Sequence, residues 1–317
     1  DRSPPTPVPL RMLSSSDIPL LLRRPHIHRG YRPLNQPKHY YLRSAFSAHN
    51  EVLNVWTHFA PLIFLLYYYV YPEFTSGYPR LPVLLLHFGT TVLLLGSSFA
   101  HLLHSRSPHD HIFWFMIDFA GIALFALCIG LQRYACAREL NPWIEWLYLP
   151  SLFIVSLLGQ FLSSSTLFVL HPFWPGRSLA RMATAFFVAL WLYLPIIHRY
   201  TDPLPEDDLD SHSRAFMWLL ISGVFMGGSV PERFFPGTFD VVGYGHQLFH
   251  MCVIMLGWNL LDAASVDCPV PSGDTNPWLS LLELRHLFCV LTVIAASFLI
   301  FLSISTLMKK ALERKYE

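Results

Sequence analysis

The stretch VLLLHFGTTVLLLGSSFAHLL, residues 83–103, decides the fold class of this protein. It contains no Asp, Glu, Lys or Arg, and about 20 such residues are needed for an α-helix to cross a bilayer. With it, the chain has eight apolar segments of similar length, at 52–70, 83–103, 112–131, 143–168, 179–197, 214–230, 240–261 and 286–308. Because membrane-spanning backbone must satisfy its own hydrogen bonds, we expect helices. The sequence therefore predicts an all-α, polytopic membrane protein with seven core transmembrane helices and an eighth C-terminal helix.

The overall composition supports the same class. Of the 317 residues, 53% are hydrophobic and only 14% are charged, and the mean hydropathy is +0.40, which is too apolar for a soluble domain of this length. The formal net charge is only +1, so no overall positive field points to nucleic acid as a partner. We therefore expect membrane lipids around the protein and no nucleic-acid partner.

Lys and Arg are distributed unevenly between the two sides of the predicted bundle. The N-terminal tail, the even-numbered connections and the C-terminal tail carry 16 of the 22 basic residues, and the opposite side carries six. Cytosolic loops are enriched in basic residues. This asymmetry predicts that both termini are cytosolic and that the acidic run at 202–210 is outside.

Five polar residues fall at the predicted cytosolic ends of apolar segments: Ser97, His101, Asp118, His246 and His250. An aspartate or a histidine in such a segment is costly unless it is paired or binds a metal. His246 and His250 are four residues apart, so both imidazoles project from one face of a helix. The pattern indicates one shared polar site.

Three neutral imidazoles and a water form a tetrahedral zinc site of the catalytic type, in which Zn²⁺ lowers the pKa of the water to about 7. In such a site Asp118 would orient the water or accept its proton, and Ser97 would steer His101 or a substrate carbonyl. The alternative is that His101, His246 and His250 are hydrogen-bonding residues between helices, with Asp118 as their partner and no metal. Residue spacing leaves both interpretations open.

A second polar cluster precedes the first core helix. Glu51, Asn54 and His58 fall at positions i, i+3 and i+7 of one helical face. They are expected either to support the metal ligands from behind or, as the preferred interpretation, to form a polar clamp between helices. His104 and His111 lie at segment ends, where we expect solvated imidazoles.

Two loop cysteines and the N-terminal region leave alternatives open. Cys136 and Cys268 fall in predicted loops, and a disulfide between them is one option. Residues 17–50 combine leucines with arginines and tyrosines, as in a segment that lies on the membrane with its arginines toward lipid phosphates, or in a solvated tail.

Three motifs resemble the progestin and adipoQ receptor family, from about Ile18 onward. The motifs are NEVLNVWTH at 50–58, Ser97 and His101 with Asp118 and Gly121 downstream, and PERFFPG at 231–237 leading to HQLFH at 246–250. The eighth segment and the 231–250 region resemble the membrane progestin receptor branch, alpha and beta subtypes. Gly245 differs from the serine that adiponectin-type members often carry there, so a role for that hydroxyl does not carry over.

The resemblance implies a cofactor and a function. In similar adiponectin receptors the three histidines hold Zn²⁺, and the serine and the aspartate line the site. The branch implies a plasma-membrane steroid receptor that binds progestins and signals rapidly, without transcription, through inhibitory G proteins, with roles such as oocyte maturation. The competing hypothesis is a zinc-dependent lipid amide hydrolase, similar to a ceramidase, with Asp118 and Ser97 as its catalytic residues.

These expectations divide the chain into six parts. They are a disordered tail at 1–16, a cytosolic juxtamembrane segment at 17–50, a seven-helix zinc-binding core at 51–262, an external loop at 263–285, the eighth transmembrane helix at 286–308 and a basic cytosolic tail at 309–317.

Overall fold

The structure, a computed structural model, describes residues 12–137 and 140–269 and six separate positions between 288 and 303. In these residues the regular structure is helical, apart from one isolated bridge between Leu13 and Tyr31. This confirms the all-α class. The six separate positions are helical, and the rest of the predicted eighth helix, 286–308, lies outside the described residues.

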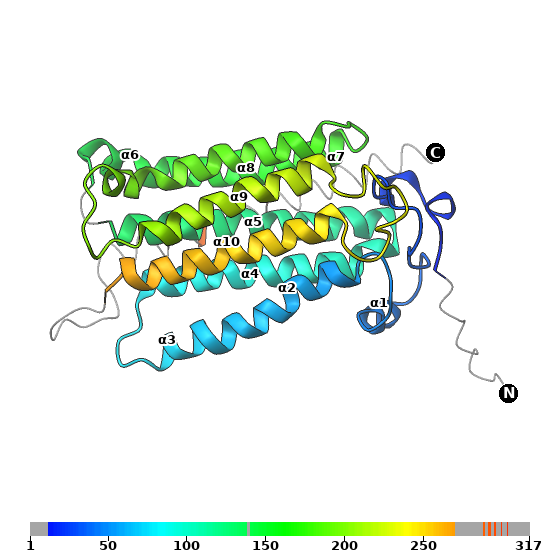
Figure 1. The fold of residues 1–317 in the computed structure, drawn as a ribbon, viewed down its shortest axis with the longest axis horizontal. Coiled ribbons are helices and arrows are strands. Elements are labelled where there is room, and N and C mark those ends of the chain that lie inside the picture. The colour runs from blue at the N-terminus through cyan, green and yellow to red at the C-terminus, as the bar shows by residue number, and fades with distance from the viewer. Residues whose placement is uncertain are drawn as a thin grey trace.

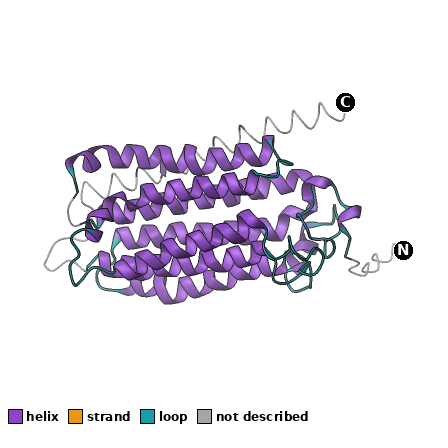
Figure 2. Ribbon diagram, turned by 45° about the horizontal axis from the view of Figure 1, so that its top comes forward, coloured by secondary structure: helices purple, strands orange, loops and turns teal. Residues whose placement is uncertain are grey.

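Seven helical rods lie side by side and form the body of the molecule (Figure 1, Figure 2). In chain order they are α2 (Val52–Leu65) with η3 (Leu66–Val70) and α3 (Tyr71–Thr75); α4 (Leu81–Leu103) with η4 (His104–Arg106); α5 (Pro108–Ala135); α6 (Pro142–Ile154) with η5 (Val155–Leu162) and α7 (Ser163–Leu170); α8 (Arg177–Tyr193) with η6 (Leu194–Tyr200); α9 (Leu209–Gly228); and α10 (Gly245–Asp267). Shorter helices precede them: η1 (Ser15–Asp17), η2 (Leu20–Leu22) and α1 (Lys38–Ser44).

Six of the seven rods are long and apolar enough to cross a membrane. The remaining rod, α9, lies between α8 and α10 (Figure 1). The chain is therefore a multi-pass membrane protein, as its hydropathy predicts.

Helix-capping residues explain why two rods begin elsewhere than their apolar runs. α5 begins at Pro108 instead of 112, because the Ser107 hydroxyl accepts a hydrogen bond from the N–H of Asp110 at 3.1 Å. α10 begins at Gly245 instead of 240, because the Glu232 carboxylate accepts a hydrogen bond from the Gly245 N–H at 2.6 Å. The PERFFPG turn thus fixes where the last described rod starts.

α4 and α5 pack closely at the centre of the bundle. A Cβ atom at Gly121 would lie 3.2 Å from the Val92 carbonyl oxygen, so the glycine allows the two backbones to approach. This contact holds the half of α4 that contains Ser97 against the half of α5 that contains Asp118.

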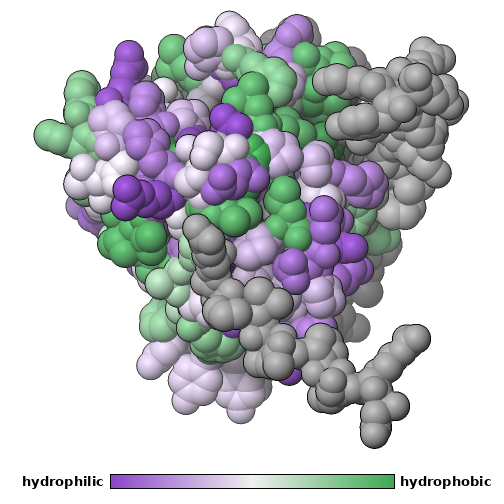
Figure 3. Space-filling model, turned by 90° about the vertical axis from the view of Figure 1, so that its right-hand side faces the viewer, coloured by the Kyte–Doolittle hydropathy of each residue, from purple (hydrophilic) through white to green (hydrophobic). Residues whose placement is uncertain are grey.

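The N-terminal segment folds over one end of the bundle. Arg32 is only 1% exposed and donates hydrogen bonds to the carbonyl oxygens of His101 and Leu102, at 2.8 and 2.6 Å. The apolar residues of this segment pack around Tyr244, namely Ile18, Leu22, Ile27 and Tyr31. Arg24 and Arg32 thus bond to protein groups, which neither sequence-based interpretation of this segment predicts for them. Figure 3 views this end, where hydrophilic side chains gather.

The opposite end of the bundle is closed by a disulfide and an ion pair. Cys136 after α5 is bonded to Cys268 after α10. The disulfide that the sequence left open as one option is therefore formed. Beside it, Arg199 pairs with Asp267, and the Asp267 carboxylate also lies 2.9 Å from His212 Nε2. α5 and α10 are therefore joined covalently at the end remote from the N-terminal segment (Figure 1).

Candidate metal centre and lipid cavity

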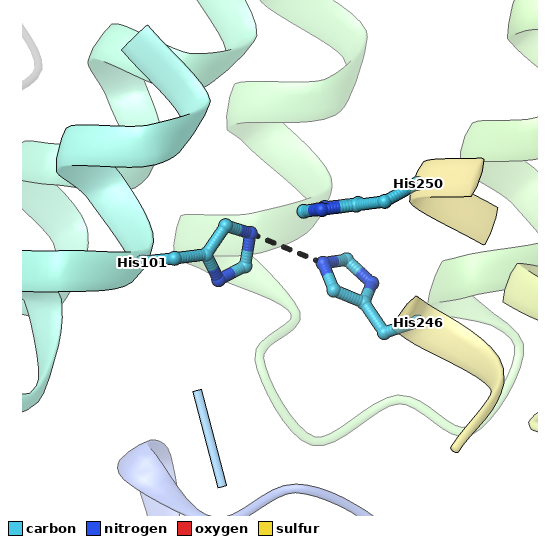
Figure 4. A group of neighbouring side chains, drawn as sticks. All are labelled: His101, His246 and His250. Carbon is cyan, nitrogen blue, oxygen red and sulfur yellow. Dashed lines mark hydrogen bonds between the residues drawn. The ribbon is translucent and has the colours of Figure 1, made fainter. Parts of the chain in front are cut away.

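Three histidine rings meet between α4 and α10 (Figure 4). They lie at the end of the bundle that the N-terminal segment covers, which we call the inner end. His101 Nε2 lies 3.2 Å from His246 Nε2, and one nitrogen of each of the three rings, including that of His250, lies within 4.8 Å of the others. The centroid of the His250 ring is 4.9 Å from that of the His101 ring and 4.7 Å from that of the His246 ring. The structure thus brings together the three residues that the sequence indicates as metal ligands.

The second nitrogen of each ring faces a different protein group. His101 Nδ1 lies 2.8 Å from Glu51 Oε2, His250 Nδ1 lies 3.0 Å from Thr57 Oγ1, and His246 Nδ1 lies 3.2 Å from Met226 Sδ. A carboxylate and a thioether only accept hydrogen bonds. In the tautomer with the hydrogen on Nδ1, His101 donates to Glu51 and His246 donates to Met226, while the Arg24 guanidinium also lies 3.3 Å from His101 Nδ1.

The Thr57 hydroxyl imposes the same protonation on His250. Its single hydrogen is donated to the carbonyl oxygen of Leu53, one helical turn earlier, at 2.7 Å. The oxygen is then an acceptor for His250 Nδ1–H. With these tautomers all three Nε2 atoms would carry free lone pairs, and those of His101 and His246 are 3.2 Å apart. A cation between them removes the repulsion that such lone pairs otherwise have.

Glu51 is held by several donors at the start of α2. The Arg24 guanidinium donates to Glu51 Oε2 at 2.9 Å, and the Asn54 amide donates to the same oxygen at 2.6 Å. Asn54 also donates to the Tyr244 hydroxyl. Burial alone would raise the pKa of Glu51, but Arg24, His104 and His101 hold it well below the usual range. Glu51 is therefore an ionised acceptor for His101.

A second group of ligand atoms, from Glu51, His101 and His104, is also close enough to hold a metal. The Arg24 guanidinium is bonded to this carboxylate, however, and already supplies the positive charge there. His104 and His111 are buried and their Nδ1 atoms are 3.0 Å apart, so the expectation that they are solvated is wrong. The three-histidine group is the better cation site.

The donor set of the three-histidine group fits zinc. Zn²⁺ favours imidazole nitrogens, and catalytic zinc sites use three protein ligands and leave one position open. Carboxylate support of a ligand histidine from behind, as from Glu51 to His101, is the usual arrangement around such ions. Residues His101, His246 and His250 would hold the ion, and Glu51 and Thr57 would orient two of the rings.

Ser97 and Asp118 lie beside the histidines and face the same cavity. Both are buried, and Ser97 is within hydrogen-bonding reach of the Asp118 carboxyl. His58 also lines this cavity, and its ring stacks on His250 with the centroids 3.8 Å apart. The structure therefore places every site residue predicted from the sequence in or next to one polar cluster.

A cavity of about 280 Å³ extends from this cluster into the bundle, which approaches the ~300–1,000 Å³ typical of small-molecule sites. Its walls are mainly apolar, with Ile122 and Phe125 from α5, Val188 and Leu192 from α8, and Leu256 from α10. The N-terminal residues Leu21 to Pro25 line its inner end. Such walls suit a flat or extended lipid with few polar groups.

Sequence reasoning missed three groups that touch the ligand histidines. Arg24 lies on a loop whose path is set by tertiary contacts, and Met226 lies in α9, 20 residues before His246. Thr57 carried a usable signal, because it directly precedes His58 and follows Asn54 by three positions on one helix.

Comparisons with known proteins agree with this architecture. The haemolysin-III related family model matches residues 46–257. Membrane progestin receptor alpha of Homo sapiens is 31% identical over 271 residues, which cover 82% of this chain and 78% of the receptor. Membrane progestin receptor beta of Sus scrofa is 30% identical over 80% of this chain and 75% of the receptor. The alpha receptor of Mus musculus is 28% identical over 99% of this chain and 94% of the receptor.

The matched region includes α2 to α10 as far as residue 257, and thus all three ligand histidines. This confirms the resemblance seen in the motifs. The chain belongs to the haemolysin-III related family of membrane proteins, in the branch of the progestin and adipoQ receptors that contains membrane progestin receptors alpha and beta.

Proposed function

We propose that this protein is a plasma-membrane receptor for a progestin or a related steroid, with an intramembrane zinc site. The observation that carries the proposal is the apolar cavity that runs from the histidine cluster into the bundle. Steroid binding is the property named for the relatives, and a rigid apolar ring system gains most from burial between such walls. Zn²⁺ would fix the inner ends of α4 and α10 relative to each other and would supply a Lewis acid at one end of the cavity.

The orientation and the transducer belong to the same proposal. We place both termini in the cytosol, which is supported by the basic residues on that side and by the Cys136–Cys268 disulfide on the other, because disulfides persist in oxidising compartments. Signalling would proceed through inhibitory G proteins at the cytosolic face, as the resemblance implies.

The test combines metal analysis with steroid binding on purified protein. We expect about one zinc per chain and saturable binding of tritiated progesterone. The variant His250→Ala should lose the zinc, whereas His87→Ala should keep it, because His87 is equally buried but does not line the cavity. Zinc-free wild-type protein that binds no progesterone would contradict the proposal.

A zinc-dependent lipid amide hydrolase is the second candidate, because Asp118 and Ser97 line the same cavity as His246 and His250. Asp118 would accept a proton from water, and Ser97 would donate a hydrogen bond to the amide carbonyl of the lipid. Incubation with a ceramide that carries a labelled acyl chain separates the two candidates. A hydrolase releases the labelled acid and loses this turnover in Asp118→Asn, while a receptor releases none.

A further inference from the structure

Two polar side chains interrupt the apolar wall of the cavity on the fourth rod. Gln160 is 5% exposed and Ser164 is fully buried, and both line the cavity. Within the described part of the chain, the Ser164 hydroxyl has no hydrogen-bond partner, and no protein group bonds to the Gln160 amide. A buried amide or hydroxyl without a partner is costly, so these groups are expected to bind something else.

The local backbone explains how the two groups reach the cavity. Gln160 lies in η5, a π-helical stretch of Val155–Leu162, and Ser164 lies in the first turn of α7. They are four residues apart, so their side chains project from the same face of the rod. π-Helical stretches within α-helices are common at functional sites. The rod thus deviates from α-helical geometry where it presents an amide to the cavity.

The depth of Gln160 relative to the histidines follows from ring contacts. The Phe168 ring lies 5.3 Å from that of Phe115, and the Phe115 ring lies 5.5 Å from that of His101, so Phe168 is level with the cluster. Gln160 precedes Phe168 by eight residues, which corresponds to roughly 10–12 Å along a helix. The cavity therefore presents two polar regions separated by about this distance.

We propose that Gln160, supported by Ser164, is the second polar contact for the ligand, and that its amide N–H donates a hydrogen bond to a carbonyl oxygen. This oxygen is carried by the end of a rigid apolar ligand that points away from the histidines. The ligand class is thus a lipid with a polar group at each end, such as a steroid with two oxo groups. This inference rests on the proposed steroid binding. It adds which side chain donates a hydrogen bond to the end of the ligand that is remote from the histidines.

Arg133 and Tyr193 are the polar side chains on the cavity wall beyond this depth, and they are less suited to this role. The Tyr193 hydroxyl donates its hydrogen to the carbonyl oxygen of His212. Arg133 is likewise engaged. Its guanidinium donates to the Leu192 carbonyl oxygen at 3.1 Å and lies 3.1 Å from His212 Nδ1. Its hydrogen-bonding capacity is therefore largely committed to the protein, while that of Gln160 is free in the described residues.

The experiment compares two changes, one in the protein and one in the ligand. Gln160→Met keeps the shape of the side chain and removes the amide. Binding of tritiated progesterone is measured directly, and two analogues, one without the 3-oxo group and one without the 20-oxo group, are measured by competition. We expect Gln160→Met to weaken progesterone binding about tenfold, as for the loss of one buried hydrogen bond. For one of the two analogues, Gln160→Met should cause no loss of affinity, because that analogue lacks the oxo group that Gln160 would contact.

Matched controls separate recognition from folding. Gln132→Met changes a glutamine that is equally buried but lies outside the cavity lining, and it should leave progesterone affinity unchanged. Ser164→Ala should cause a smaller loss with the same dependence on the analogue. Zinc content of all three variants should match that of the wild type, because none of these residues touches the three histidines. Thermal unfolding of Gln160→Met and Ser164→Ala should also match it, since neither loses a hydrogen bond to a described protein group, whereas Gln132→Met loses its bond to Cys268 Sγ.

Two results would overturn the inference, and they differ from failure of the proposed function. If the wild type binds progesterone but Gln160→Met binds all three ligands as tightly, or loses affinity equally for all three, Gln160 does not read a carbonyl. If the wild type binds no progesterone, the proposed function itself fails and the inference fails with it.

Discussion

At the scale of single residues, the site depends on side chains that hold the imidazoles by their outer nitrogens. Glu51, Thr57 and Met226 each face one Nδ1 atom. When they accept a hydrogen bond from Nδ1, Nε2 is left unprotonated and available to a cation at the common centre. The ligand histidines alone therefore do not define the site, because their protonation is set by neighbours from α2 and α9.

The first prediction concerns Thr57. Thr57→Val keeps the shape and removes the acceptor for His250 Nδ1–H, so zinc affinity should fall about 10–100-fold. Thr57→Ser retains the hydroxyl and should bind zinc nearly as the wild type does. The measurement is competition with a zinc chelator, together with the visible spectrum of the cobalt-substituted protein. Equal zinc affinity of the valine and serine variants would show that the hydroxyl does not orient His250.

The second prediction concerns Gly245, which directly precedes a ligand histidine. A Cβ atom there would lie 2.7 Å from the carbonyl oxygens of both Phe225 and Val230, too close for a normal contact. Gly245→Ala should therefore displace the start of α10 and lower the free energy of unfolding by about 1–3 kcal/mol. Thermal unfolding and zinc content of the purified variant check this.

Gly257→Ala is the matched control for this substitution. It lies in the same helix, and a Cβ there meets no atom within 4 Å. Its stability should be unchanged or slightly higher, since alanine favours helix more than glycine does. If the two alanine variants unfold at the same temperature, the close contacts at Gly245 do not constrain the start of α10.

At the scale of elements, the N-terminal segment is part of the bundle. Arg24 reaches from this segment to Glu51 at the start of α2, and Arg32 donates to the last carbonyl oxygens of α4. Burial lowers the pKa of Arg32 to about 10, which still leaves the guanidinium charged at neutral pH. The N-terminal segment, which lines one end of the cavity, is thus bonded to the Glu51 carboxylate that faces His101.

The third prediction tests this link. Arg24→Met leaves the Glu51 carboxylate buried without its cation, so the free energy of unfolding should fall by about 3 kcal/mol. The double variant Arg24→Met with Glu51→Gln should regain part of this loss, because it removes the unpaired charge. Thermal unfolding of the purified variants provides the measurement.

Arg29→Met serves as the control, since Arg29 is exposed in the same segment. It should unfold as the wild type does. An equal destabilisation by Arg24→Met and Arg29→Met would mean that the ion pair with Glu51 contributes nothing specific.

At the scale of the whole molecule, the two ends of the bundle differ in chemistry. One end carries the N-terminal segment, the histidine cluster and most of the basic residues of the described part of the chain, and the other carries the Cys136–Cys268 disulfide. The proposed orientation places the first end in the cytosol, so the metal site would be reached from inside the cell.

The fourth prediction is a test of this orientation. An epitope inserted after Asp202, in the exposed acidic loop between η6 and α9, should bind antibody on intact cells. An epitope at Asp17 should bind antibody only after permeabilisation. The reverse staining pattern would place the histidine cluster at the external face.

Much of the candidate site could be predicted from the sequence. His101, Asp118, His246 and His250 stand out because a polar residue in an apolar segment needs a partner. Arg24 and Met226 could not be predicted, because loop path and helix register bring them to the site and neither leaves a periodic pattern. The polar cluster of Glu51 and Asn54 was visible, but its contact with His101 depends on how α2 packs on α4.

The helical, multi-pass architecture and the residue types of the candidate metal site can be predicted from the amino-acid order alone. The physical reason is that the bilayer imposes segment length and apolar composition, and that burying imidazole and carboxylate requires partners. The folded structure is needed to see which group faces the second nitrogen of each histidine, which segment lines the end of the cavity, and which amide faces its interior. Those depend on distances of a few ångströms between elements that are far apart in the chain, and residue spacing along one helix does not encode such distances.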